Sequence, residues 1–103
     1  MRVCVLVESK FQAPPEMMPK LLQAFAGWRE KWRSKMTSFD FWAGAAGGMA
    51  IVDVANETEL SQMMMEFPFG PFSEITPRLI TNGDDALKRL AKTMQEMMAQ
   101  MAG

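Results

Sequence analysis

Two aspartates, Asp40 and Asp53, are the residues of this chain best suited to acid–base chemistry. They lie in two runs of alternating polarity within the stretch SFDFWAGAAGGMAIVDVA, which has a glycine-rich turn between them. If that turn is centred on Ala46 and Gly47, Asp40 lies opposite Asp53 across a β-hairpin. Carboxylates held close together in a partly apolar site raise the pKa of one of them, which can then transfer protons. The sequence therefore predicts a catalytic pair.

Further side chains on the predicted face of this pair could hold a ligand. Five are expected to do so: Trp42, Ile51, Phe72, Glu74 and Arg78. Trp42 could stack on a flat molecule, although a tryptophan on a strand also serves for packing. The same charged residues could instead line a dimer interface and pair with arginines of a second copy. Both interpretations are compatible with the sequence.

Histidine and tyrosine are absent from the chain. Their absence excludes histidine-ligated haem or zinc, Ser-His-Asp and Cys-His nucleophiles and a histidine base within this chain. The only cysteine, Cys4, cannot form an internal disulfide and is expected to be a small apolar strand residue. Because histidine and tyrosine are absent, any acid–base chemistry must use carboxylates, and we expect no cofactor.

Methionine occurs 12 times and is spread along the chain, with four methionines in the last helical stretch. Met94, Met97, Met98 and Met101 would place thioethers on one helical face, where Cu(I) could bind. No histidine or second cysteine accompanies them, and methionine is also an adaptable packing residue. We therefore predict packing or an interface for this face, and no metal.

Hydrophobic periodicity predicts the order β-α-β-β-α-β followed by a helix. This is the ferredoxin-like arrangement, an α+β fold with a four-stranded antiparallel sheet in the order 4-1-3-2 and two helices covering one face. The first strand is expected over residues 2–9, and the first helix from near Met18 to Met36. Asn56 and Glu59 form a capping box for the second helix. Pro77 places the fourth strand at an edge of the sheet.

The predicted domain covers residues 1–83, and residues 84–103 form a C-terminal helix that belongs to the same domain or to an oligomer contact. A chain of 103 residues is one domain, and its net charge of -1 provides no basic surface for nucleic acid or an anionic membrane. No run of about 18 apolar residues occurs, and the N-terminus MRVCVLVES is typical of a strand rather than a signal peptide. We expect a cytoplasmic protein.

Three segments give the chain a resemblance to a known family. The run PPEMMPKLLQAF, the glycine-turned hairpin and the closing FPFGPFSEITPRL resemble the small dimeric α/β-barrel proteins of the muconolactone isomerase type and neighbouring single-domain families. The resemblance covers about residues 1–81. It implies a ferredoxin-like protomer whose open sheet face meets that of a second copy, with a ligand cavity in or beside the barrel. The chain departs from the isomerases in its extra C-terminal helix and in lacking histidine.

Two classes of function follow. In the first, the protein is a homodimer or a multiple of dimers that binds a small, partly apolar organic molecule, as a cofactor-independent isomerase or oxygenase. In the second, it is a non-enzymatic assembly protein whose sheet face and C-terminal helix serve oligomerisation. A ligand-sized cavity lined by the predicted site residues would favour the first class.

Overall fold

A four-stranded antiparallel sheet forms the centre of the structure. The computed structural model describes residues 1–102. The strands lie in the order β2-β3-β1-β4, as predicted. Their bounds are β1 (Arg2–Ser9), β2 (Met36–Phe41), β3 (Gly47–Asp53) and β4 (Ser73–Leu79). Pro77 lies in β4, at the edge of the sheet, where its missing N–H costs no ladder bond on the outer side.

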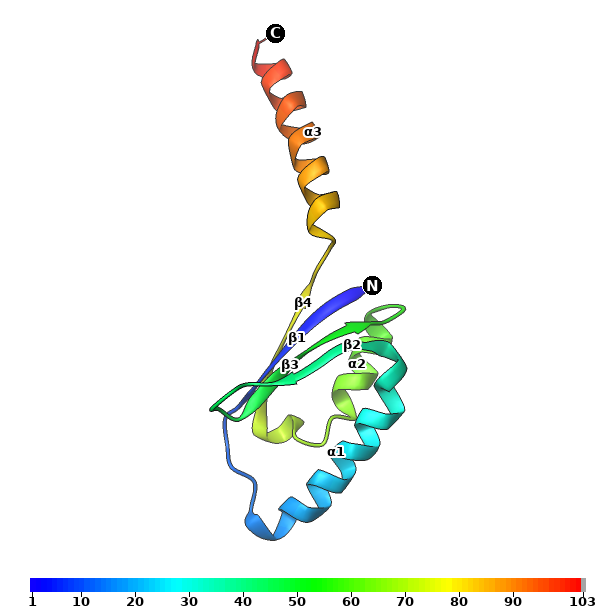
Figure 1. The fold of residues 1–103 in the computed structure, drawn as a ribbon, viewed down its shortest axis with the longest axis vertical. Coiled ribbons are helices and arrows are strands. Elements are labelled where there is room, and N and C mark those ends of the chain that lie inside the picture. The colour runs from blue at the N-terminus through cyan, green and yellow to red at the C-terminus, as the bar shows by residue number, and fades with distance from the viewer. Residues whose placement is uncertain (103) are drawn as a thin grey trace.

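Two helices, α1 (Met18–Trp32) and α2 (Glu57–Met65), cover one face of this sheet, and a third, α3 (Gly83–Ala102), extends away from it (Figure 1). Three short 3-10 turns connect the elements: η1 (Pro15–Met17), η2 (Arg33–Lys35) and η3 (Gly70–Phe72). The predicted ferredoxin-like α+β fold is confirmed. The opposite face, with Cys4, Leu6, Met49, Ile51 and Thr76 along its middle, is called the open sheet face below.

The core lies between the sheet and the two covering helices. Val3, Val5 and Val52 are almost fully buried on the sheet side, and Met63 of α2 has no exposed surface. Trp28 of α1 buries its ring there and donates its indole N–H to the Met63 carbonyl at 2.9 Å. This bond satisfies a polar group that would otherwise be costly to bury.

The pairing of β2 with β3 differs from the predicted register. Phe41 pairs with Gly48 rather than Val52, because the connection is a five-residue loop centred on Gly44 and not a tight turn at Ala46 and Gly47. Gly44 has a φ of 79°, a left-handed conformation that glycine adopts without strain. The displacement is an even number of residues, so each side chain keeps its predicted face.

Met36 begins β2. The spacing of apolar residues had predicted that Met36 ends α1, and this prediction is wrong. The helix stops at Trp32 and the chain turns through η2. A bulge then follows at Thr37, whose hydroxyl donates to the Ile51 carbonyl at 3.2 Å, while the Ser38 hydroxyl accepts from the Ile51 N–H at 3.1 Å. Side-chain bonds thus replace the ladder where the two strands lose register.

Side-chain caps fix the starts of the other helices. The Asn56 side chain accepts the Glu59 N–H at 3.0 Å, and the Glu59 carboxylate accepts the Ala55 N–H at 3.2 Å, one residue before the cap. The predicted helix start at Asn56 is confirmed. Asn82 caps α3 in the same way by accepting the Asp85 N–H at 3.1 Å.

Helix α3 makes the molecule elongated, with principal extents of 69 × 26 × 21 Å. From Leu87 to Ala102 every residue is exposed, and Figure 1 shows the helix continuing beyond the end of β4 without packing on the sheet. None of the helices within residues 1–102 is both long enough and apolar enough to cross a membrane.

Candidate functional site

A cavity of about 350 Å³ lies between the sheet and the two covering helices. Residues of β1, β2 and β3 form one wall, and residues of α1, α2 and the segment after α2 form the other. It is therefore on the helix-covered face, whereas the sequence placed the candidate site on the open sheet face.

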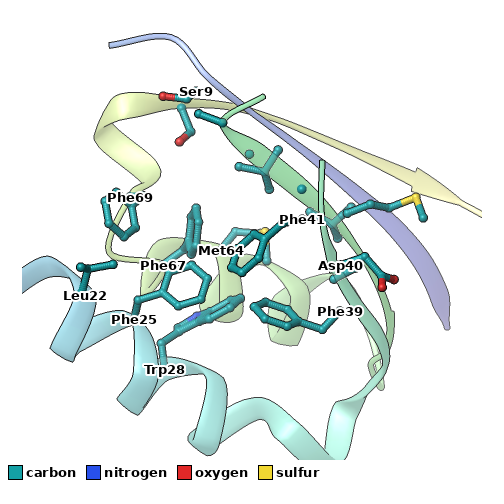
Figure 2. Close-up of a pocket in the computed structure, with 18 of the residues that line it drawn as sticks. Ser9, Leu22, Phe25, Trp28, Phe39, Asp40, Phe41, Met64, Phe67 and Phe69 are labelled. Carbon is teal, nitrogen blue, oxygen red and sulfur yellow. The ribbon is translucent and has the colours of Figure 1, made fainter. Parts of the chain in front are cut away.

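The walls of this cavity are mainly aromatic (Figure 2). Phe25 of α1 is at the centre of the cluster, with ring centroids 5.6 to 6.2 Å from those of five neighbours. These neighbours are Trp28, Phe39, Phe41, Phe67 and Phe69. The rings are tilted or edge-on to Phe25, the arrangements that aromatic pairs prefer. Such a cluster presents both ring faces and ring edges to a bound molecule.

Polar groups are few in the lining. Ser9, Gln12 and Ser73 contribute hydroxyl and amide groups, and Ser9 and Ser73 are partners across the β1–β4 pairing. In Figure 2 Ser9 lies at one end of the cavity, away from Trp28 and Phe39. The cavity therefore has a long apolar part and a polar end.

Two glycines bring strand backbones close together at this end. A Cβ on Gly48 would lie 2.2 Å from the Asp40 carbonyl oxygen, and one on Gly47 would lie 2.2 Å from that of Val7. Gly47 also has a φ of 117°, a backbone conformation that residues with a side chain rarely adopt. Trp42 covers the same corner and donates its indole N–H to the Val7 carbonyl at 3.0 Å. Small residues here hold the hairpin against β1.

Asp40 and Asp53 do not face one another, so the predicted pairing is wrong. Asp40 pairs with Met49, and Asp53 pairs with Arg2 at the other end of β3. Met49, the partner of Asp40, and Asp53 are four positions apart along β3, a distance of about 13 Å, which is too far for the two carboxylates to share a proton. Asp53 instead lies 3.5 Å from the N-terminal ammonium of Met1.

Asp40 is nevertheless part of the cavity lining. Figure 2 shows the Asp40 carboxylate directed away from the ring cluster. The rings of Phe39 and Phe41, on either side of Asp40 in the strand, point toward the ring cluster. This is the alternation of side chains along a strand. Asp40 is thus a rim residue of the cavity and not an interior one.

None of the five predicted ligand-binding residues lines the aromatic cavity. Trp42 lines a shallow hollow with Glu8 and Lys10, and Ile51 lies on the open sheet face. The Phe72 carbonyl accepts the backbone N–H groups of Lys10 and Phe11. Arg78 is exposed and opposite Cys4.

Glu74 belongs to a surface ion-pair group with Lys10. The Lys10 ammonium lies 3.0 Å from the Glu74 carboxylate and 3.5 Å from that of Glu8. Glu74, and then Glu8, raise the pKa of Lys10 because both stabilise its charged form. These exposed groups organise the end of β1, next to the mouth of the cavity.

Sequence periodicity identifies some of the cavity residues as inward-facing apolar positions, but it does not identify the cavity. Phe25 and Trp28 belong to the apolar stripe of α1, and Phe67 and Phe69 to the segment FPFGPF. The sequence signal that could have pointed to the cavity is the number of aromatic residues placed on one sheet face. Periodicity shows which face a ring occupies, but it does not show whether the rings fill the space between the layers.

No metal-binding cluster occurs in the part of the chain that the structure describes. Within residues 1–102, histidine, cysteine, aspartate and glutamate side chains form no group of three or more suited to an ion.

Comparison of the sequence with known protein families gives no match, and comparison with curated proteins gives none either. Solved structures do match. Muconolactone isomerase superposes with a TM-score of 0.71 at 16% identity, covering 80% of this chain and 90% of that protein.

A second solved structure is 5-chloro-2-hydroxyhydroquinone dehydrochlorinase from Burkholderia phenoliruptrix, in complex with 2,5-dihydroxybenzoquinone. It superposes with a TM-score of 0.63 at 13% identity, covering 82% of this chain and 98% of that protein. At these identities the likeness concerns the fold. The resemblance inferred from the sequence is confirmed at that level: the chain has the ferredoxin-like fold of the muconolactone isomerase type.

Proposed function

We propose that the aromatic cavity binds a small, flat and largely apolar organic molecule. The observation that carries this proposal is a space of about 350 Å³ walled by the Phe25 cluster of aromatic rings, with polar side chains at one end. Its volume falls in the range of small-molecule sites, roughly 300–1,000 Å³. Phe11, Leu22 and Phe41 line it and are 68%, 56% and 69% exposed, which gives the site an apolar entrance.

The lining also indicates the chemistry of the ligand. Aromatic walls suit a planar ring, and the polar end can bond a hydroxyl or carbonyl group through Ser9, Gln12 or Ser73. The wall holds no cationic side chain, so a neutral molecule fits better than an acid. The two structural neighbours, named for a lactone and for a hydroxyhydroquinone, support a small oxygenated ring as the ligand class.

The reaction proposed for this site is a cofactor-independent isomerisation or oxygenation of the bound ring. Asp40 at the rim is the candidate acid–base residue, because it is the carboxylate in the cavity lining. Asp53 was predicted to form a catalytic pair with Asp40. Because Asp53 lies at the far end of β3, it would have to act separately. The ligand-binding roles predicted for the open-face residues require a second copy to close a site there.

Substitutions at two adjacent residues of β3 can distinguish a ligand site in the aromatic cavity from one on the open sheet face. Ala50 lines the cavity, and Ile51 lies on the open sheet face. Ala50→Phe should fill the cavity and weaken binding of neutral phenols, quinones and lactones by about tenfold or more, equivalent to about 1.4 kcal/mol. Ile51→Phe, the matched control, should leave affinity unchanged. Calorimetry across the panel gives both affinities, and loss of binding in Ile51→Phe alone would place the site on the open face.

Any ligand that binds can then be followed for conversion to product in the same proteins. Asp40→Asn should abolish turnover of a ligand whose reacting group lies at the rim, within hydrogen-bond reach of the carboxylate. It should leave ligand affinity within a few-fold, because the carboxylate points away from the rings. Asp53→Asn should retain turnover. Equal activity in Asp40→Asn and the unmodified protein would leave the cavity as a binding site without acid–base catalysis by Asp40.

A second candidate function is assembly without catalysis. The observation that favours it is the exposed apolar stripe of α3, on a helix that extends away from the sheet. Assembly and ligand binding use different surfaces, so one does not exclude the other.

A further inference from the structure

Helix α3 carries an apolar stripe that its own domain cannot cover. The six largest side chains of this stripe are 54% to 85% exposed. They are Leu87, Leu90, Met94, Met97, Met98 and Met101. Only the first turns touch the rest of the chain, for example through the bond from Arg89 to the Thr81 hydroxyl at 3.1 Å. A contiguous apolar surface on an isolated helix indicates a missing partner.

The charges of α3 indicate which kind of partner fits. Its charged residues are Asp84, Asp85, Lys88, Arg89, Lys92 and Glu96, and they sum to zero. A helix without net charge gains no attraction to an anionic membrane or to nucleic acid. Leu87, Leu90, Met94, Met97 and Met101 follow one another at steps of three and four, the spacing of a seam between two helices.

The apolar positions of the stripe are also arranged symmetrically about Met94. Leu87 and Met101 lie at equal distances from it, as do Leu90 and Met98. Ala91 and Met97 form the third such pair. We propose that α3 pairs with α3 of a second copy in an antiparallel arrangement centred on Met94.

Packing and charge both favour antiparallel over parallel pairing. In the antiparallel pair the small Ala91 lies at the level of the partner helix's Met97, so a large side chain fills the space beside a small one. A parallel pair would put two alanines at one level. The basic residues Lys88, Arg89 and Lys92 would also lie level with their counterparts, whereas reversal places them beside the negative C-terminal half of the other helix dipole.

The pair spans about two heptads, so it adds to another contact between copies and does not act alone. An antiparallel pair also places the two globular parts at opposite ends of the seam, because each is attached at the N-terminus of its α3 (Figure 1). Copies joined in this way keep their open sheet faces and cavity mouths accessible.

Two neighbouring positions of α3 test whether the stripe forms an interface. Met94→Glu puts a charge at the centre of the stripe, and Gln95→Glu puts the same charge on the polar side of the helix. Light scattering should show that Met94→Glu lowers the molar mass by about twofold, while Gln95→Glu does not. Met94→Glu should also lose helical circular dichroism, because an unpaired helix of this length is only marginally stable. Retention of ligand affinity and tryptophan fluorescence shows that the domain is folded, and an unchanged mass in a folded Met94→Glu protein would overturn the proposal.

Disulfide cross-linking tests the direction of the pair. In a Cys4→Ser background, Leu87→Cys mixed with Met101→Cys should give a cross-linked heterodimer on oxidation, while Leu87→Cys alone should not. Cross-linking of Leu87→Cys with itself would show a parallel pair and overturn the antiparallel one. If the mass falls in Met94→Glu but neither cross-link forms, α3 packs on a different surface of the second copy and the helix pair is wrong.

Discussion

At the scale of single residues, two glycines show how differently one residue type can act in this chain. Gly48 is buried in β3, where a Cβ would lie 2.2 Å from the Asp40 carbonyl oxygen. Gly27 lies on α1, where an added Cβ meets nothing within 4 Å. The first glycine is required by the close approach of backbones, and the second is not.

Gly48→Ala should therefore destabilise the protein by about 1–3 kcal/mol, since β2 and β3 must separate to admit the methyl group. Gly27→Ala should stabilise it by about 0.5–1 kcal/mol through the better helix propensity of alanine. Urea denaturation followed by circular dichroism measures both differences. A neutral Gly48→Ala substitution would mean that the hairpin shifts without cost.

At the scale of elements, Glu66 joins the two covering helices. Glu66 directly follows α2. Its carboxylate lies 2.7 Å from the Lys31 ammonium of α1 and 3.2 Å from the indole nitrogen of Trp32. Gln62 also donates to it. The Lys31 bond is the main cause that lowers the pKa of Glu66 from its usual value of 4.5, with the Gln62 bond second.

A carboxyl group with a lowered folded-state pKa stabilises the fold above its unfolded pKa, and that contribution is lost as the pH falls through the folded pKa. Glu66→Gln should thus lower the urea midpoint at pH 7, and its difference from the unmodified protein should shrink as the pH is taken below 4.5. Glu96→Gln on exposed α3 is the control. If the Glu66→Gln effect were independent of pH, hydrogen bonding rather than charge would join α1 to α2.

At the scale of the whole molecule, the open sheet face and α3 offer two separate contacts between copies. Leu6 lies in the middle of the open sheet face, between its register partners Met49 and Thr76. We expect two copies to meet through this face, because a monomer would leave its apolar centre in water. Contacts through both surfaces would give an assembly larger than a dimer.

Leu6→Glu should reduce the molar mass measured by sedimentation, because it places a charge in that contact. Gln23→Glu, on the exposed side of α1, adds a charge elsewhere and should leave the mass unchanged. Because the α3 pair does not act alone, Leu6→Glu should give a monomer, and adding Met94→Glu should lower the mass no further. A monomeric unmodified protein at micromolar concentration would contradict both contacts.

The sequence by itself determined the order of the elements and the face that the strand residues of β1 and the hairpin occupy. Alternation in β1 and in the hairpin separates helix-facing Phe39 and Phe41 from outward-facing Asp40, and this assignment survives the change in register. The reason is that the period of a strand is two, so an even displacement preserves the faces. The cap at Asn56 and the edge position of Pro77 are equally local and were predicted correctly.

Tertiary structure alone decided the register and the cavity. The pairing of β2 with β3 depends on a five-residue loop, on the bulge at Thr37 and on the bond from Trp42 to Val7, which lies 35 residues away in the chain. The cavity depends on how far α1 and α2 stand from the sheet, which is set by the packing of side chains from several elements at once. Helical periodicity can assign Phe25 or Phe67 to the interior, but the space left between them is a property of the assembled layers.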